Sequence, residues 1–355
     1  MASPQLSAIQ VPFPDAPTRQ RFVESEPTDD IEFQMSPEVL AKITAGLSLI
    51  QIRSLLKGAS MAGEPVTFPL VAGRKKKIIE QECHGLVEFV APGHDFSHVG
   101  GMARLKADLM QVADGVKKGH RHRVPMGMIF VGPMGTGKTF IAEAFAAESG
   151  LTCLKLKNFR DKWVGSTEAN LERVLDLVDA LGYVLLIIDE ADRSLSAGSG
   201  SDGGVNSRVI ARLKEFMSDT SHRGRVVILM MTNRPDKLDT DLKRPGRFDV
   251  KMPFFFPEEA SERQLILEAQ VRKNKLEMAE DIDFTTAVEN TDGYSSAELE
   301  SVLIAAANLA ADDDQTTIGQ EHLDQASADI IPSRDSRMLE YMEMLAVFEL
   351  SLIHI

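Results

Sequence analysis

Four residues, Gly132, Gly137, Lys138 and Thr139, form the pattern Gly-x-x-x-x-Gly-Lys-Thr within the segment GPMGTGKT. The apolar run MIFVG leads into this segment, and TFIAEAFAAES, with apolar residues at helical spacing, follows it. A glycine-rich turn between a strand and a helix lets backbone N–H groups and the helix dipole surround phosphates. Lys138 adds a point charge, and the Thr139 hydroxyl suits Mg²⁺. We expect nucleotide contacts from Pro133, Met134, Gly135, Thr136, Gly137, Lys138 and Thr139.

Two acidic residues, Asp189 and Glu190, end the apolar run VLLIIDE further along the chain. The carboxyl ends of parallel strands meet at one edge of a sheet, where phosphate sites form. At that edge Asp189 would hold Mg²⁺, directly or through water, and Glu190 would polarise an attacking water molecule. Together the two motifs predict a chain that binds and hydrolyses a nucleoside triphosphate.

The stretch from Asp95 to Ser333 resembles the AAA+ ATPases, and specifically their classical AAA clade. FSHVGG (96–101) is similar to the clade's opening segment, which implies that the backbone of Val99 and Gly100 contacts adenine. MMTNRPDKLDTDLKRPGRFD (230–249) matches the second region of homology. The resemblance implies ATP and Mg²⁺ as cofactors. It also implies that Asn233, at the end of the run VVILMM, holds the lytic water against the γ-phosphate.

Arg244 and Arg247 match the two arginines that family members extend into a neighbouring subunit's nucleotide. A guanidinium there compensates the charge that develops as the γ-phosphoryl group leaves. Taken alone, the same residues could be surface arginines of a Pro-Gly turn, paired with Asp241 or Asp249. If they act in trans, the active site lies between subunits. The resemblance therefore implies a homo-oligomeric ring, most commonly a hexamer.

The segment DKWVGSTE holds Trp163, the only tryptophan in the chain, followed by Val164 and Gly165. In the family, an aromatic–hydrophobic–Gly triplet after the second strand points into the central pore of the ring, and these residues match it. An indole can grip an extended polypeptide without demanding a particular sequence. The alternative is a tryptophan that folds back onto its own subunit. SAGSGSDGGVN (196–206) is either a second pore-facing loop or a passive connection.

The lid matches the family less closely. The clade's Gly-Ala-Asp-Leu appears here as Ser296, Ala297, Glu298 and Leu299, and the resemblance implies a nucleotide contact from Ala297. Gln270 stands where many relatives place a histidine near the adenine. Both departures bear on nucleotide affinity and base preference. Met134 replaces the common second proline of the P-loop, where only backbone is needed.

The elements around these motifs predict an α/β fold, with a P-loop parallel sheet sandwiched by helices and a small helical lid after it. Continuous apolar runs alternate with helical patterns after residue 95, which is typical of a parallel sheet covered on both faces. The predicted strands are GMIFVG, LTCLKLK, VLLIIDE, VVILMMT and FDVKMPF. After Pro257 only helical patterns remain.

We divide the chain into five segments. Residues 1–35, rich in Pro, Asp, Glu and Gln, are predicted to be disordered. A mostly helical N-terminal region, 36–94, starts at Ser36–Pro37, and its first helix is expected to break near Gly46. The large nucleotide-binding subdomain spans 95–257, the helical lid 258–333, and a C-terminal helix or tail 334–355. That apolar tail packs on the lid or binds a partner helix.

Composition and charge narrow the classes of molecule that this protein is expected to bind. The formal net charge of −14 repels nucleic acid and anionic lipid overall. KKGHRHR (117–123) is therefore interpreted as a solvated loop rather than a nucleic-acid or metal site. The sequence shows no signal-peptide pattern and no apolar run of membrane-spanning length. Cys83 and Cys153 lack the spacing of a disulfide framework or metal site. We expect a soluble, intracellular, cytoplasmic protein.

One P-loop predicts one ATPase module per subunit, and the sequence contains no His-Glu-x-x-His metalloprotease motif. The leading hypothesis is a ring-forming ATP hydrolase that remodels or unfolds a protein client. The N-terminal region would select the client or an adaptor, and Trp163 would grip it. The alternative hypothesis is an ATP-dependent assembly switch, or a chaperone-like scaffold, that docks clients without threading them.

Overall fold

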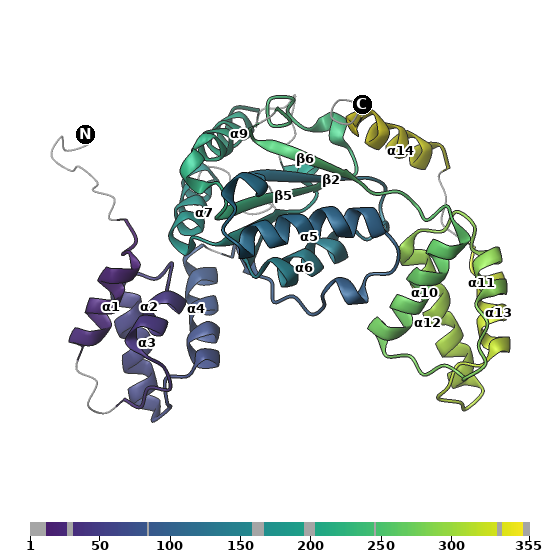
Figure 1. The fold of residues 1–355 in the computed structure, drawn as a ribbon, viewed down its shortest axis with the longest axis horizontal. Coiled ribbons are helices and arrows are strands. Elements are labelled where there is room, and N and C mark those ends of the chain that lie inside the picture. Colours follow the sequence, from purple (N-terminus) through teal and green to yellow (C-terminus); the bar gives the residue numbers. More distant parts are fainter. Residues whose placement is uncertain are drawn as a thin grey trace. The chain divides into compact units, whose positions relative to one another are not determined.

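A computed structural model describes residues 12–26, 31–83, 85–157, 167–194, 203–244, 246–331 and 336–350 (Figure 1). The chain divides into two compact units. The first combines residues 1–89 with 157–184, and the second combines 90–156 with 185–355.

The first unit is a small helical body. Its helices are α1 (Ala16–Ser25), α2 (Pro37–Ile43), α3 (Leu49–Ala62), α4 (Phe68–Glu82) and α7 (Thr167–Leu181), and it also holds the short strand β1 (Val87–Phe89). Ser36, Ser48 and Thr67 accept hydrogen bonds from the first turns of α2, α3 and α4, which is how N-caps satisfy unpaired backbone N–H groups. The predicted break near Gly46 separates α2 from α3.

The helix α1 corrects the prediction of disorder over residues 1–35. Asp15 caps the helix by accepting the backbone N–H of Thr18 at 2.9 Å, and a proline occupies its first turn. Arg19 is only 5% exposed, and its Nε donates to the carbonyl of Ala41 at 2.8 Å, near the C-terminal end of α2. The guanidinium thus satisfies a carbonyl group of another helix, and a charged composition hides this tertiary contact.

The second unit is built on parallel strands. Its five strands are β2 (Gly127–Val131), β3 (Thr152–Leu156), β4 (Val184–Ile188), β5 (Val226–Thr232) and β6 (Phe248–Pro253). They lie in the order β3-β4-β5-β2-β6, and β2 pairs in parallel with both β5 and β6. Every residue of β2, β4 and β5 is buried. The five strands and the parallel arrangement predicted from the continuous apolar runs are confirmed.

The register of the paired strands determines which chain segments leave the sheet at the same edge. Val131, the last residue of β2, pairs with Thr232 at the end of β5 and with Pro253 at the end of β6. The chain segments that follow β2 and β5 therefore leave the sheet at the same edge. The strand β4 is the other neighbour of β5, and the residues that follow it, Asp189 and Glu190, line the same cavity as residues that follow β2 and β5.

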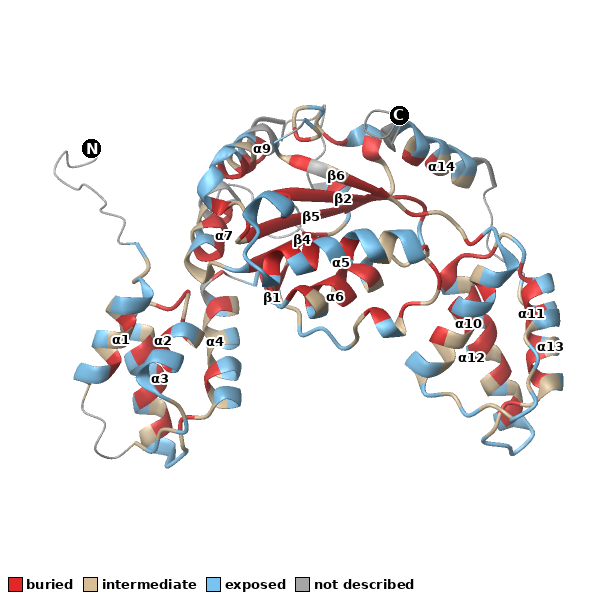
Figure 2. Cartoon of the chain, viewed as in Figure 1, coloured by how far each residue is buried: buried red, intermediate tan, exposed pale blue. Residues whose placement is uncertain are grey.

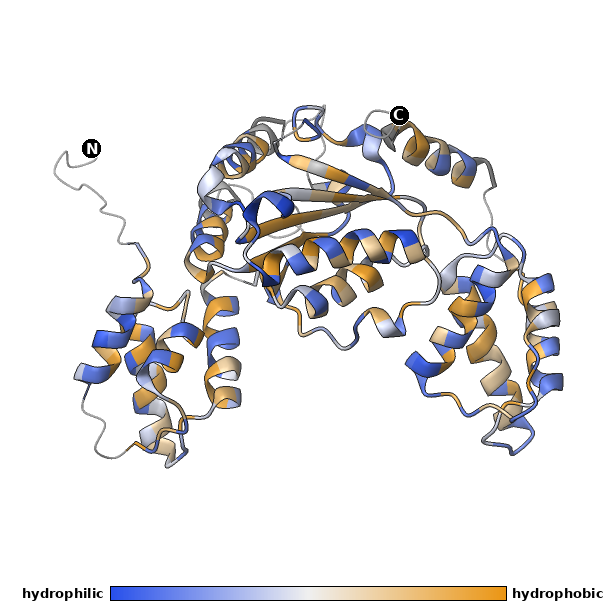
Figure 3. Cartoon of the chain, in the orientation of Figure 1, coloured by the Kyte–Doolittle hydropathy of each residue, from blue (hydrophilic) through white to orange (hydrophobic). Residues whose placement is uncertain are grey.

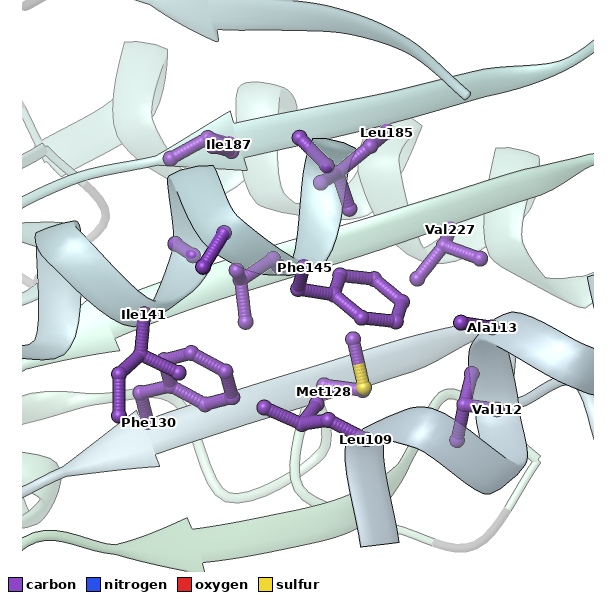
Figure 4. Packing of buried hydrophobic residues seen from close by; sticks show 14 of the residues in the cluster. Leu109, Val112, Ala113, Met128, Phe130, Ile141, Phe145, Leu185, Ile187 and Val227 are labelled. Atoms are coloured by element: carbon purple, nitrogen blue, oxygen red, sulfur yellow. The ribbon is translucent and has the colours of Figure 1, made fainter. Parts of the chain in front are cut away.

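The other helices of this α/β domain are α5 (Ala103–Lys117), α6 (Lys138–Ser149), α8 (Ala191–Ser194) and α9 (Gly203–Ser218), with short 3₁₀ turns η1 (Phe96–His98), η2 (Arg121–Arg123), η3 (Thr220–His222) and η4 (Pro235–Lys237). Two of them, α5 and α6, pack on the sheet through one apolar cluster. Phe145 of α6 and Leu109 of α5 pack against Met128, Phe130 and Val227 of the strands (Figure 4). Burying one such side chain completely stabilises the fold by roughly 1.5–3 kcal/mol. Figure 3 shows that apolar and polar residues alternate along α5, as expected of a helix with one buried face.

The lid is a separate helical cluster of the second unit. It contains α10 (Ala260–Asn274), α11 (Thr285–Asn290), α12 (Ser296–Asp312) and α13 (Gln320–Asp329), and Figure 2 shows buried positions along these helices. Leu267, Leu299 and Leu323 belong to the core of this cluster. The last helix, α14 (Ser336–Leu350), contacts β6 and η4. Within the described residues, no helix combines the length and apolar character needed to cross a bilayer.

Two glycines of the first unit provide a matched test of its packing. Gly46 and Gly63 both have positive φ, at 81° and 63°. A Cβ on Gly46 would lie 2.8 Å from a methyl carbon of Leu181, whereas a Cβ on Gly63 would meet nothing within 4 Å. We expect Gly63→Ala to cost about 1–2 kcal/mol of backbone strain. Gly46→Ala adds overpacking, for a total of about 2–5 kcal/mol. Urea unfolding followed by circular dichroism measures both, and equal midpoints would contradict the packing of α7 on this turn.

Candidate active site

A cavity of about 420 Å³ opens at the sheet edge where β2, β4 and β5 end. The P-loop and the start of α6 form one wall, the ends of β4 and β5 a second, and α10 and α12 of the lid a third. The structure brings most of the expected site residues together here: Val99, Gly100, Met134, Gly135, Gly137, Lys138, Thr139, Asp189, Glu190, Asn233 and Ala297.

Pro133 and Thr136 support the P-loop from behind rather than line the cavity. Thr136 is fully buried, and its hydroxyl donates to the carbonyl of Pro133 at 2.9 Å. Gly132 has φ 153°, and a Cβ there would lie 2.1 Å from the carbonyl oxygen of Phe254. Only glycine permits this approach, so the loop is tied to the chain that follows β6.

The ammonium group of Lys138 donates its hydrogen bonds to the P-loop itself. Its Nζ donates to the carbonyls of Gly132 at 2.8 Å and Pro133 at 2.6 Å. Burial lowers the pKa of Lys138 to about 8, although Asp189 and Asp192 act in the opposite direction. A phosphate that enters the loop would replace carbonyl dipoles with full negative charge, and this change favours the ammonium form.

The Asp189 carboxylate forms an ion pair with a lysine of the same chain. Its Oδ2 lies 2.8 Å from Nζ of Lys155 on β3, and its Oδ1 accepts the backbone N–H of Glu190 at 2.9 Å. Sequence reasoning missed Lys155. The available signal was a lysine between two leucines of the predicted strand LTCLKLK, but only the pairing order of β3 and β4 identifies its partner.

Glu190 has a strained backbone and its own counter-ion. Its φ of 46° lies in the left-handed region, which costs a residue other than glycine of order 1–3 kcal/mol and is common at functional sites. Its Oε2 lies 2.9 Å from Arg193, which sequence reasoning also missed. Because both side chains are more than half exposed, this ion pair is weak and can be exchanged for water or substrate.

Asn233 directly follows β5, beside the strand that ends in Asp189, as the expected strand order requires. The residue before it, Thr232, is buried, and its hydroxyl donates to Oδ1 of Asp192 at 2.8 Å. The same hydroxyl accepts the backbone N–H of Arg234 at 2.9 Å. These contacts hold the chain on both sides of Asn233, so its amide faces the cavity from a fixed position.

The lid contacts the P-loop through backbone groups. The N–H of Ala297 donates to the carbonyl of Gly135 at 3.1 Å, at the first turn of α12. Ser295 and Glu298 form a capping box that fixes this turn. Gly100 approaches α10 so closely that a Cβ would lie 2.3 Å from the carbonyl of Leu265. Gln270 also lines the cavity, and its Oε1 is buried without a hydrogen-bond partner among the residues that the structure describes.

Arg244 and Arg247 do not lie in this cavity. They line a second cavity of about 380 Å³. Arg244 pairs with Asp241 at 3.0 Å, as the surface alternative expected, while its side chain stays 72% exposed. Arg247 donates to the backbone carbonyl of Asp241 at 2.7 Å. The predicted pore loop, Trp163–Gly165, lies outside the described residues, as does most of the glycine- and serine-rich segment 196–206.

Comparison with family models divides the chain into three matched segments. Residues 128–256 match the ATPase family associated with various cellular activities (AAA), and residues 281–325 match the AAA+ lid domain. Residues 17–84 match the second helical domain of an AAA+ chaperone.

Curated relatives match over most of this chain. It is 32% identical over 315 residues to the ATPase family protein 2 homolog of Caenorhabditis elegans, covering 85% of this chain and 43% of the relative. It is 32% identical to ATP-dependent zinc metalloprotease FtsH 1 of Sphaerobacter thermophilus, and the match covers 72% of this chain and 40% of the relative. It is 26% identical to the Cell division cycle protein 48 homolog of Archaeoglobus fulgidus, and the match covers 82% of this chain and 43% of the relative. The chain therefore spans less than half the length of these relatives.

The site geometry and these matches agree. A P-loop, an acidic strand end and a strand-end asparagine meet in one cavity, and the lid closes one side of it. The domain that carries them binds ATP. The chain contains an AAA ATPase domain with an AAA+ lid, and it is related to FtsH and CDC48-type AAA proteins.

Proposed function

We propose that this chain is the ATP-hydrolysing subunit of a homo-oligomeric ring that remodels a protein client. One observation carries the hydrolytic part of the proposal. Lys138 and Thr139 face Asp189, Glu190 and Asn233 across a single cavity. Phosphate-binding groups on one side and water-activating groups on the other are what phosphoryl transfer to water requires.

Thr139 and Asp189 would hold Mg²⁺. Hydroxyl and carboxylate oxygens are the hard ligands that this ion prefers, and the Asp189 carboxylate already pairs with a cation, Lys155, at 2.8 Å. When bound, Mg²⁺ would neutralise charge on the β- and γ-phosphates. Lys155 would release Asp189 and stay within reach as a second positive charge, while Lys138 would exchange two carbonyl partners for phosphate oxygens.

Glu190 would accept a proton from the attacking water, and Asn233 would hold that water in line with the γ-phosphate. Glu190 would first leave Arg193, a weak pair at an exposed position. The positive φ of Glu190 supports this role, because such backbone strain is common at functional sites. A fixed amide at Asn233 orients the water without competing for its proton.

Arg244 and Arg247 would complete the active site of a neighbouring copy. Arg244 is largely exposed and belongs to a cavity that shares no lining residue with the nucleotide cavity of the same chain. The family relation supports a ring, and the N-terminal helical region, whose residues 17–84 match an AAA+ chaperone domain, would select the client. Trp163 would grip that client in the pore.

ATP hydrolysis per subunit is expected to rise with protein concentration, because Arg244 acts on a partner's nucleotide. Arg244→Ala should lower the rate by at least about 10³-fold, the effect of an arginine finger. Mixed with wild-type chain, the same variant should inhibit beyond simple dilution. A phosphate-release assay across a concentration series measures this. Glu190→Gln, which keeps the shape of the side chain and removes the base, is the inactive control. A rate independent of concentration and of Arg244 would contradict a trans-acting ring.

ATP affinity is expected to fall as pH rises above about 8, the pKa of Lys138 in the free site. Phosphate stabilises the ammonium and raises its pKa, so binding takes up a proton wherever free Lys138 is neutral. Affinity should then drop by up to about tenfold per pH unit above 8 and level off below 7. Calorimetric titrations at pH 8.5 in two buffers of different ionisation enthalpy measure the uptake directly. Proton release, or affinity that rises with pH, would contradict the assignment.

Trp163 distinguishes remodelling from an assembly switch. Trp163→Ala should abolish ATP-dependent unfolding of a fluorescent protein bearing an unstructured tail, whereas Trp163→Tyr, which keeps a large aromatic surface, should retain most of it. Loss of fluorescence in the presence of a trap for unfolded protein reports the reaction. If unfolding by Trp163→Ala equals that of the unmodified chain, threading is wrong and the assembly switch replaces it.

A further inference from the structure

The last helix of the chain, α14, packs against the ATPase domain. It contacts β6 (Figure 1) and the short turn η4, which begins two residues after Asn233. Met342 and Ala346, on its inner face, are buried. The helix begins after the segments that match the AAA and lid models, which end at residues 256 and 325. A helix outside both matched segments therefore contacts the turn that follows the proposed water-holding amide.

Arg234 connects that turn to α14. Its guanidinium donates two parallel hydrogen bonds to the Asp236 carboxylate, from Nε at 2.9 Å and from Nη2 at 2.7 Å. These side chains are only 25% and 30% exposed, so solvent screens this pair less than a surface ion pair. The guanidinium carbon also lies 5.3 Å from the centroid of the Tyr341 ring, on α14. At this distance the negative face of an aromatic ring attracts the cation.

The backbone of Arg234 directly follows Asn233. Its N–H donates to the Thr232 hydroxyl at 2.9 Å, and Lys243 donates to the carbonyl of Pro235 at 3.1 Å. Asn233 thus lies between a buried residue of the sheet and a residue whose side chain is held by η4 and α14. Arg234 is not among the described residues that line the nucleotide cavity. Its influence on the reaction must therefore pass through its neighbour.

We propose that Tyr341 is a positioning residue for ATP hydrolysis, and that through it α14 acts, by way of Arg234, on the amide of Asn233. The inference rests on the proposed water-holding role of Asn233 and adds the element that sets the position of that amide. A catalytic group displaced by a fraction of an ångström loses much of its effect, because the reacting atoms must be aligned. Tyr341 is also absent from the described lining of the cavity, so α14 would adjust the chemical step and not the binding of ATP.

Substitutions of Tyr341 test this inference, with kcat and KM measured separately at protein concentrations that form the ring. Tyr341→Ala should lower kcat about two- to fivefold, the effect of losing one cation–π contact at a partly exposed position. KM and the binding of a fluorescent ATP analogue should not change. Tyr341→Phe, which keeps the ring, should retain most of the rate. Tyr341→Lys, which places a like charge against Arg234, should be slower than the alanine variant.

Met344→Ala is the matched control, because Met344 belongs to the same helix and is 60% exposed. Its rate should equal that of the unmodified chain. The rates are measured across a concentration series. A loss in Tyr341→Ala that disappears as protein concentration rises would mean that α14 acts on assembly, which overturns the inference. An increase in KM without a decrease in kcat would overturn it as well.

A double-mutant cycle identifies the route from α14 to the site. Arg234→Ala should also lower kcat, and adding Tyr341→Ala to it should cause little further loss, because the cation that the ring contacts is gone. If the two losses multiply, Tyr341 does not act through Arg234, and the inference is wrong.

Asn233→Ala separates the inference from the proposed function. If Asn233→Ala is slow while Tyr341→Ala equals the unmodified chain, the role of Asn233 stands and the role of α14 is wrong. If Asn233→Ala hydrolyses ATP at the normal rate, the proposed water-holding role is wrong, and the inference falls with it. Circular dichroism checks the fold of each variant, and Tyr341→Leu, which keeps an apolar side chain without the ring, serves if the alanine variant does not fold.

Discussion

The parallel register of β2 with β5 and β6 is the constraint on which the rest of the ATPase domain depends. It aligns Val131 with Thr232 and Pro253, so that the P-loop and Asn233 leave the sheet at one edge. The strand β4, on the other side of β5, delivers Asp189 to the same edge. A slip of one residue would turn every side chain of a strand to the opposite face and separate these groups. Complete burial of the three strands makes such a slip costly, so the apolar runs that form the core also position the polar site.

The site contains internal partners for the charges that ATP will later engage. Lys138 donates hydrogen bonds to P-loop carbonyls. Asp189 forms an ion pair with Lys155, and Glu190 forms one with Arg193. Isolated charges at a partly buried sheet edge would be costly, and these contacts offset that cost while the pocket is free. Each contact is also replaceable, because phosphates, a divalent cation and water offer the same groups stronger or equivalent partners. In the proposed function ATP binding would therefore be an exchange of partners, and Lys155 and Arg193, once released, would add positive charge beside the phosphates.

Much of the fold and of the site could be predicted from sequence, because the relevant signals are local. Continuous apolar runs predict five strands of the parallel sheet, and the P-loop pattern places Lys138 at the start of a helix. The helix α1 was missed because its stability depends on Arg19 reaching the carbonyl of Ala41 in another helix, a contact that composition does not reveal. Lys155 was missed for a similar reason. Its partner is set by the order of strands, and strand order is a property of the whole sheet.

The sequence by itself determined the chemical groups and the local elements that carry them: a glycine-rich loop that only one backbone shape satisfies, an acidic strand end, and arginines in a turn after β5. The tertiary structure decided which groups meet. It separates Arg244 and Arg247 from the nucleotide cavity of their own chain and brings Tyr341, from the last helix, to the side of Arg234. The physical reason is that local structure depends on neighbours along the chain, whereas the convergence of charges depends on register and packing between distant segments.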